Sequence, residues 1–286
     1  MKVLELLLIT MRPYRWSRSA VIFMPLIFSG DPLNWVYLLK ISVGFLIFSF
    51  LTGSVNIIED ITSVQSDKND PAKRVFPIAS GDLSVNKAEF ALATILIGSF
   101  VASFFLGPGF GITAVIYFFM LIGYFLYLKK MPFMDIVTVA TSAGVVITAG
   151  TLAISKPVSG WLIFFVFMSS AFIALSARMR ELILAKASSG QVSGIYEEKV
   201  LEQSIMISAS SSLIVYAMYC LSSATGTGSN MIYSLPLAVY GIYRIISLTN
   251  DKVSELSLEK LILKDPYFMG TLAAWVIVVS VLLAVF

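Results

Sequence analysis

The sequence predicts an all-α integral membrane protein, a bundle of helices that cross the bilayer. Of its 286 residues, 58% are hydrophobic and only 13% are charged, which exceeds the apolar content of ordinary water-soluble domains. The apolar residues form repeated stretches of about 20, the length that a helix needs to cross roughly 30 Å of hydrocarbon. These stretches lack the alternating pattern of membrane β-barrels, so the bilayer favours helices, which satisfy their backbone hydrogen bonds within each segment.

Nine membrane-spanning helices are expected, all within one domain that covers residues 1–286. The predicted spans lie at about 14–29, 35–58, 88–106, 109–128, 133–154, 158–178, 200–222, 231–248 and 268–286. Longer polar segments follow the second, sixth and eighth spans, at roughly 59–87, 179–199 and 249–267. Because loops carry function more often than the scaffold that positions them, the functional site is expected in these segments.

The distribution of basic residues predicts the orientation of the chain. Of the 20 Lys and Arg residues, 18 fall on one side of the predicted spans, and only Lys40 and Lys156 lie toward the other. Loops rich in Lys and Arg stay in the cytoplasm, so the N-terminus and the site are expected at the cytoplasmic face of the cell membrane. The first span lacks a small-residue cleavage site and is expected to be retained. The sequence contains no block of basic residues, so a nucleic-acid partner is not expected.

The residue types exclude several classes of chemistry. The chain contains no histidine and a single cysteine, Cys220, which lies within an apolar span. His-based triads, imidazole zinc sites and disulfide frameworks are therefore excluded. Any reaction must draw on carboxylates, basic side chains, hydroxyls or amides, with or without a metal ion.

A dense cluster of charged residues follows the second predicted span, in the stretch NIIEDITSVQSDKNDPAKR, residues 56–74. On a helix of about 100° per residue, five polar side chains share an arc of roughly 100°. They are Asn56, Glu59, Asp60, Ser63 and Asp67. Carboxylates at membrane depth are costly unless a cation neutralises them, and Mg²⁺ prefers oxygen ligands. These five are candidate Mg²⁺ ligands, with Asp60 and Asp67 as candidate catalytic residues; the alternative is that they only solvate a helix end.

Two basic residues, Lys73 and Arg74, stand just beyond the acidic face, in DPAKRVFPIASG. Fixed cations and a metal-binding face would grip one diphosphate from two sides, and a departing diphosphate needs such charge neutralisation. Pro71 and Pro77 flank the pair and restrict the loop. Alone, Lys73 and Arg74 would be ordinary cytoplasmic charges; beside the acids, they are candidate diphosphate ligands.

A second charged element closes the sixth predicted span, in ALSARMRELILAK. Arg178 and Glu181 are three residues apart and would share one side of a helix, close enough for an ion pair or for joint contact with a ligand. Together with Arg180 they are candidate substrate-binding residues. Tyr196, which precedes the seventh span, is a further candidate.

The stretch MRPYRWSRS places three arginines, Arg12, Arg15 and Arg18, at the same membrane boundary near the N-terminus. Arginine beside tryptophan at such a boundary is typical of interfacial anchoring. A phosphate contact is the alternative, and Arg18 is included among the candidate substrate-binding residues.

Several stretches carry a family resemblance: RPYRW and FMPLIFSG, DKNDPAKRVFPIASGDLS, LYLKKMPFMDI, FIALSARMREL and YGIYRIISL. With nine spans and an acidic end to the second, the sequence resembles the UbiA superfamily of intramembrane transferases. It is most similar to the branch typified by decaprenyl-phosphate phosphoribosyltransferase. The resemblance runs through nearly the whole chain and implies a motif, approximately NDxxDxxxD, that binds diphosphate through Mg²⁺.

This chain departs from that motif at two positions. Aligned from RPYRW onward, the family's Asn falls on Glu59 and its second Asp on Ser63, while the other two acids fall on Asp60 and Asp67. Either Glu59 replaces the missing ligand, or the register slides so that Asn56 and Asp60 form the first pair. The sequence leaves both readings open.

The resemblance also bears on the donor, because prenyl-transferring relatives carry a second Asp-rich motif after span six. This chain has Arg178, Arg180 and Glu181 there, which suit an additional phosphate better than a second metal. The leading hypothesis is transfer of a 5-phosphoribosyl group from its 1-diphosphate to a polyprenyl phosphate. The alternative is prenyl transfer to an aromatic or polar-lipid acceptor, and a third possibility is a non-catalytic homologue.

Overall fold

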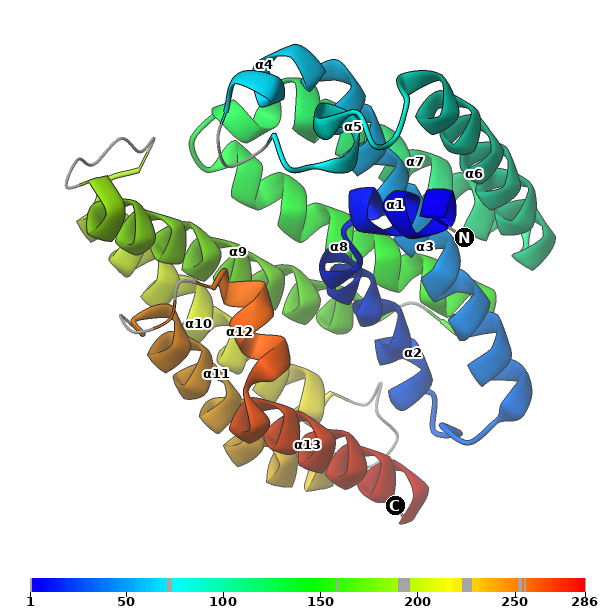
Figure 1. Ribbon diagram of the computed structural model, residues 1–286. Helices are drawn as coiled ribbons and strands as arrows, with labels where there is room; N and C mark the ends of the chain where they lie inside the picture. The colour runs from blue at the N-terminus through cyan, green and yellow to red at the C-terminus, as the bar shows by residue number, and fades with distance from the viewer. Residues whose placement is uncertain are drawn as a thin grey trace.

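The computed structural model describes residues 2–70, 74–157, 159–189, 196–222, 228–251, 254 and 256–285. These residues form helices and connecting turns, with no strand among them (Figure 1). The predicted all-α fold class is confirmed.

The helices differ widely in length, from single turns to membrane-spanning rods. In chain order they are α1 (Lys2–Met11), the 3₁₀ helix η1 (Pro13–Phe23), α2 (Met24–Ile27), α3 (Trp35–Thr62), α4 (Val64–Asn69), α5 (Pro77–Ser80), α6 (Val85–Leu106), α7 (Pro108–Leu126), η2 (Leu128–Lys130), α8 (Met134–Ala153), α9 (Gly160–Ser189), α10 (Glu198–Leu221), η4 (Gly228–Ser234), α11 (Leu235–Thr249), α12 (Leu258–Lys264) and α13 (Pro266–Val285).

Eight helical segments in the described part of the chain are long and apolar enough to cross a membrane. They correspond to the second through ninth predicted spans. The predicted first span, 14–29, instead comprises η1 and the short helix α2. Its arginines and Pro25 interrupt the apolar run, so no single α-helix forms there. The count of nine spans and the cytoplasmic N-terminus stay predictions.

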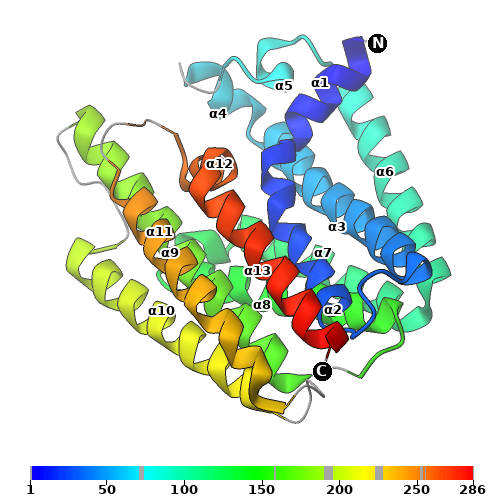
Figure 2. The ribbon, with the colours of Figure 1, turned by 90° about the horizontal axis from the view of Figure 1, so that it is seen from below.

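Consecutive long helices pack side by side: α3 with α6, α6 with α7, α7 with α8, α8 with α9, and α9 with α10. Figures 1 and 2 show α9 to α13 grouped on one side of the molecule and α3, α6 and α7 on the other, with α8 between them. Because η1 also packs on α3 and α8, it is held against the centre of the bundle. The short helices α4 and α5 lie together at one end, where α3 finishes (Figure 1).

Local chemistry explains where several helices begin. The side-chain oxygen of Asn34 accepts hydrogen bonds from the Val36 and Tyr37 amides, which caps the first turn of α3. Pro108 opens α7 at the position where a helix needs no amide donor. Inside the bundle, Phe48 of α3 packs edge-on against Tyr117 of α7 with ring centroids 4.8 Å apart, which fixes the two helices against each other.

Gly150 of α8 packs directly against the backbone of η1. A Cβ atom at this position would lie 2.8 Å from the Ile22 carbonyl oxygen. We expect Gly150→Val to lower the free energy of unfolding by about 1–3 kcal/mol, since a backbone atom must move to make room. Thermal unfolding of the purified protein in detergent measures this. Gly98→Val is the control, because a Cβ there meets no atom within 4 Å; equal losses in the two variants would contradict the packing argument.

Candidate active site

A row of three arginines begins at the N-cap of η1, where Arg12 adopts the left-handed conformation, and continues within the helix with Arg15 and Arg18. The arginines follow one another at intervals of three residues. A 3₁₀ helix has 3.0 residues per turn, so side chains three residues apart are stacked above one another. The row faces acidic residues: Arg12 and Arg15 contact the end of α3, and Arg18 binds Glu259 of α12 with Nε 2.8 Å from Oε1.

Glu59, in the last turn of α3, is surrounded by three cations. Its Oε1 accepts a hydrogen bond from Lys129 Nζ at 2.9 Å, and its Oε2 lies 3.2 Å from Arg12 Nη1 and 3.9 Å from Arg15 Nη1. The side chain is only 27% exposed. Three paired cations reduce the cost of holding a carboxylate at this depth, and in this arrangement Glu59 positions basic groups at the site.

Asn56 lies one turn before Glu59 and joins the same network. Its side-chain oxygen accepts from Arg15 Nη1 at 2.9 Å, and its amide donates to the Met11 carbonyl at 3.0 Å. Both polar ends of Asn56 are therefore engaged by residues of the N-terminal segment. The polar face of α3 is therefore contacted by several segments, chiefly through the basic side chains of Arg12, Arg15 and Lys129.

Asp60 is the buried acid of this face, with 3% of its surface exposed. Its Oδ1 accepts a hydrogen bond from Arg12 Nη2, while its Oδ2 is buried without a hydrogen-bond partner in the structure. A buried carboxylate oxygen without a partner is costly, and its presence beside a polar cluster indicates a site for a further positive or donor group.

Asp67 of α4 completes the acidic end. Its Oδ2 accepts from Ser63 Oγ at 2.6 Å, and Ser63 Oγ also lies 2.8 Å from the Glu59 carbonyl. Ser63 thus orients Asp67. No group of three Asp, Glu or Cys side chains suited to a metal forms among the described residues. Mg²⁺ in phosphate sites takes only one or two carboxylates plus phosphate and water oxygens, so Asp60 and Asp67 fit it.

Arg178 of α9 organises a second polar cluster. Its guanidinium donates to three groups: Nε to Asp135 Oδ2 at 2.8 Å, Nη1 to Glu181 Oε2 at 2.7 Å and Nη2 to Tyr124 Oη at 3.2 Å. Asp135, at the start of α8, is 2% exposed. The predicted contact between Arg178 and Glu181 is present, and the planar five-donor fork of arginine explains why one side chain holds three partners.

Tyr196 closes this second cluster from the segment before α10. Its hydroxyl donates to Asp135 Oδ1 and accepts from the Phe133 amide at 2.8 Å. Burial raises the pKa of Tyr196 to about 12, and the hydrogen bond to Asp135 acts in the same direction. Tyr196 therefore remains a neutral hydrogen-bond donor at physiological pH.

The end of α7 connects the two clusters. Tyr124, in its last turn, contacts Arg178, and Lys129, in η2 immediately after it, pairs with Glu59. The acids of α3 and the arginine of α9 therefore approach the same turn of the chain from different helices.

Four further predicted site residues stand apart from these contacts or outside the described residues. Arg180 is 1% exposed and donates to the carbonyls of Asp251, Ser254 and Leu256, so it holds the segment before α12 instead of joining Arg178. Arg74 is exposed. Lys73 lies outside the described residues. Arg18 is paired with Glu259 of α12.

The sequence reasoning missed Lys129, Asp135 and Tyr124 as site residues. Lys129 and Asp135 lie in LYLKKMPFMDI, where the basic pair and the acid flank a predicted span boundary; that clustering was the available signal. Tyr124 stands inside an apolar span and gave no signal, because only its contact with Arg178 distinguishes it.

Residues 19–269 match the model of the UbiA prenyltransferase family. The chain belongs to this family. Among its relatives, the protein named decaprenyl-phosphate phosphoribosyltransferase in Mycobacterium tuberculosis is 24% identical over 281 residues, which cover 96% of this chain and 92% of the relative. The protein of the same name in Mycolicibacterium smegmatis is 26% identical over 218 residues, covering 74% and 69% of the two chains.

Solved structures of UbiA homologues share the fold of this family member. A UbiA homologue from Archaeoglobus fulgidus bound to DMAPP and Mg²⁺ superposes with a TM-score of 0.72 at 17% identity, covering 98% of this chain and 99% of that one. A digeranylgeranylglyceryl phosphate synthase gives a TM-score of 0.65 at 19% identity over all of both chains. At these identities the likeness concerns the fold, a membrane helical bundle of the UbiA type.

Proposed function

We propose that this UbiA-family protein transfers a 5-phosphoribosyl group from phosphoribosyl diphosphate to a polyprenyl phosphate. The observation that carries the proposal is its similarity, over 96% of its length, to a relative named decaprenyl-phosphate phosphoribosyltransferase. The residues of the second cluster support it further. That cluster is organised around the guanidinium of Arg178, a group suited to bind phosphate oxygens.

The roles follow from the two clusters. Asp60 and Asp67 hold Mg²⁺, which neutralises charge on the diphosphate when bound. Glu59 positions Lys129, Arg12 and Arg15, whose positive charges face the same leaving group. Lys73 and Arg74 remain proposed diphosphate ligands of the loop beyond α4.

The α9 cluster then serves the phosphoribosyl end of the donor. Arg178 contacts a phosphate oxygen, Glu181 orients the guanidinium or a sugar hydroxyl, and Asp135 with Tyr196 fixes the arginine in place. Arg180 acts only by holding the segment before α12.

The reaction needs no general base. The bond between the anomeric carbon and the diphosphate oxygen breaks, positive charge develops on the sugar, and an oxygen of the lipid phosphate forms the new bond. The attacking phosphate is already ionised, so no proton has to move. Catalysis then depends on positioning and on stabilising the departing charge, which suits a chain that contains no histidine.

Prenyl transfer to an aromatic or polar-lipid acceptor is the second candidate. The family to which the chain belongs is described as a prenyltransferase family, and the structural relative from Archaeoglobus fulgidus binds DMAPP and Mg²⁺. The α3 site would serve either donor, because both carry a diphosphate.

A donor-exchange assay tests these proposals. We expect purified protein with Mg²⁺ and a polyprenyl phosphate to move label from phosphoribosyl diphosphate into the lipid extract, and not to move label from geranylgeranyl diphosphate into an added acceptor. The reverse pattern would assign the prenyl reaction. Transfer from neither donor, across several divalent metals and acceptors, would identify a homologue without this activity.

A further inference from the structure

The short helix α12 bridges two parts of the bundle. It packs on α9, α11 and α13 on one side and on η1 on the other, and Figure 2 shows it between α11 and the N-terminal part of the chain. With seven residues, α12 is well below the roughly 12–15 residues at which an isolated helix becomes marginally stable. Its position therefore depends on the contacts at its ends and along its length.

Both ends of α12 are anchored to neighbouring helices of the same group. Before its first residue, the guanidinium of Arg180 on α9 donates to three backbone carbonyls between residues 251 and 256. After its last residue, Arg244 of α11 binds Asp265 through two hydrogen bonds, with Nε 2.9 Å from Oδ2 and Nη2 2.8 Å from Oδ1. Two arginines thus fix the ends of α12 to α9 and α11.

The contacts between α12 and η1 are weaker. Glu259 Oε1 accepts a hydrogen bond from Arg18 Nε at 2.8 Å and a second from Nη2 of the same guanidinium. Lys260 Nζ lies 4.8 Å from the centroid of the Tyr14 ring. The Arg18 side chain is 47% exposed, and ion pairs and cation–π contacts at exposed sites contribute little stability. These contacts can therefore break while the ends of α12 remain anchored.

Glu259 uses only part of the hydrogen-bonding capacity of Arg18. Both hydrogen bonds go to one carboxylate oxygen, and Nη1 of Arg18 makes no hydrogen bond with any residue that the structure describes. A guanidinium carries five donors in one plane, a geometry that matches the several oxygens of a phosphate. A phosphate group would therefore bind Arg18 through more hydrogen bonds than Glu259 does.

Two contacts connect this part of η1 to the candidate active site. The Tyr14 ring, which meets α12, also lies 5.9 Å from the guanidinium of Arg15, and Arg15 donates to the α3 cluster. Arg18 itself interacts electrostatically with Tyr124, whose hydroxyl accepts a hydrogen bond from Arg178. A phosphate at Arg18 would therefore lie beside both clusters.

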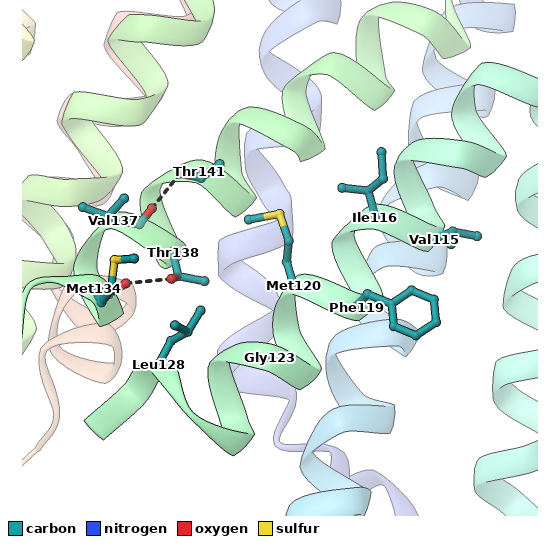
Figure 3. Close-up of a pocket in the computed structure, with 10 residues that line it drawn as sticks. All are labelled: Val115, Ile116, Phe119, Met120, Gly123, Leu128, Met134, Val137, Thr138 and Thr141. Atoms are coloured by element: carbon teal, nitrogen blue, oxygen red, sulfur yellow. Dashed lines mark hydrogen bonds between the residues drawn. The ribbon is translucent and has the colours of Figure 1, made fainter. Parts of the chain in front are cut away.

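The pocket between α7 and α8 offers a phosphate no such partner. This pocket of about 560 Å³ is lined by apolar side chains and by Thr138 and Thr141, whose hydroxyls donate to carbonyls of α8 (Figure 3). None of its lining residues is charged, so a phosphate would lose its hydration there without gaining an ion pair.

We propose that Arg18 binds a phosphate group of the substrate and that Glu259 occupies Arg18 until this phosphate arrives. In this arrangement α12, residues 258–264, is a strap that is closed on η1 in the ligand-free protein and released by the phosphate. The proposal rests on the proposed function, in which donor and acceptor both carry phosphate groups. It adds one residue that binds phosphate and one carboxylate that competes with it.

Hydrogen–deuterium exchange of α12 in the purified protein measures the opening of the strap. The probes are ribose 5-phosphate and farnesyl monophosphate, which carry the phosphate of a sugar donor and of a lipid acceptor. We expect at least one of them to raise exchange of residues 258–264 by about threefold or more, because released segments exchange faster. Ribose and farnesol, which lack the phosphate, should leave exchange unchanged. The probe that opens the strap identifies which substrate supplies the phosphate.

Glu259→Gln removes the competing charge. We expect it to lower the Kd of the effective probe, measured by calorimetry, by about two- to fivefold, the range that a largely exposed ion pair supports. Exchange in α12 should be fast in this variant without ligand. Glu198→Gln is the matched control, because Glu198 also pairs with a basic side chain, Lys186, but where α10 begins beside α9; its Kd and exchange should equal those of the unmodified protein.

Arg18→Gln tests the phosphate ligand itself. We expect this variant to weaken binding of the effective probe by about tenfold or more, because charge-assisted hydrogen bonds are lost. The probe should then no longer change the exchange of α12. Thermal unfolding close to that of the unmodified protein verifies that the variant remains folded.

Exchange in α12 that neither phosphate changes, or a Kd in Glu259→Gln equal to that of the unmodified protein, would overturn the proposal. These outcomes are separate from the proposed reaction. Phosphoribosyl transfer without release of α12 would refute the strap alone. Release of α12 by a phosphate, in a protein that does not transfer from phosphoribosyl diphosphate, would refute the reaction while supporting the strap.

Discussion

Asp67→Asn is expected to lower kcat by about 10²–10³-fold while leaving the fold intact, since it removes one of the charges that, in the proposed function, hold the metal against the diphosphate. Asparagine keeps the size of the side chain and can still accept a hydrogen bond from Ser63 Oγ. A weaker metal site also predicts that more Mg²⁺ is needed for half-maximal rate. Steady-state kinetics over a Mg²⁺ series measures both effects.

Asp82→Asn is the matched control for this substitution. Asp82 lies in the exposed turn before α6 and accepts a hydrogen bond from Ser80 Oγ at 2.8 Å, so it repeats the Ser–Asp pairing away from the candidate site. Its variant should keep the kcat and Mg²⁺ dependence of the unmodified protein. Wild-type kinetics in Asp67→Asn would remove Asp67 from the metal site.

The sequence was sufficient to predict eight of the helices, because a bilayer imposes a minimum length of apolar helix that composition reveals directly. It was insufficient for the segment 14–29. Arginines at intervals of three fit one face of a 3₁₀ helix, yet over seven residues this spacing differs little from that of an α-helix. In the structure, Arg12 and Arg15 contact α3, which is more than 40 residues away, and local spacing does not reveal such contacts.

Some features of the candidate site likewise follow from local sequence, and others depend on contacts between residues far apart in the chain. The shared face of Asn56, Glu59 and Asp60 follows from helical spacing, and α3 indeed continues to Thr62. That Lys129 neutralises Glu59 depends on packing between α3 and the end of α7, which no local pattern records. The sequence therefore locates the acids. It does not reveal that Glu59 is already paired with Lys129 and Arg12.

The different environments of Arg178 and Arg180 follow from helix geometry and could be predicted from their spacing in the sequence. Two residues apart on α9, their side chains point about 200° apart around the axis. Arg178 accordingly faces Asp135, and Arg180 is buried on the other side among carbonyls of the segment before α12. Grouping the two as joint phosphate ligands was inconsistent with a continuous helix through both positions.

Arg12→Leu is expected to lower the free energy of unfolding by about 3–5 kcal/mol, because it leaves a buried acid without its partner. Arg12 is the residue that donates to Asp60, and the side chains of the two are 12% and 4% exposed. In a chain of this size the loss corresponds to a fall in Tm on the order of 10 °C. Thermal unfolding in detergent measures it, and adding Asp60→Asn should recover part of the loss by removing the unpaired charge.

Arg18→Leu separates the effect of burial from that of losing any arginine of η1. Arg18 lies within η1, six residues beyond Arg12, and also pairs with an acid, Glu259, but its side chain is 47% exposed. Exposed ion pairs contribute about 0–1 kcal/mol, so this variant should unfold within a few degrees of the unmodified protein. Equal destabilisation by the two substitutions would mean that the arginines support η1 itself. A large difference would mean that Asp60 needs a cation when no ligand is bound, so that Mg²⁺ would compete with Arg12 for Asp60 and diphosphate would compete with Asp60 for Arg12.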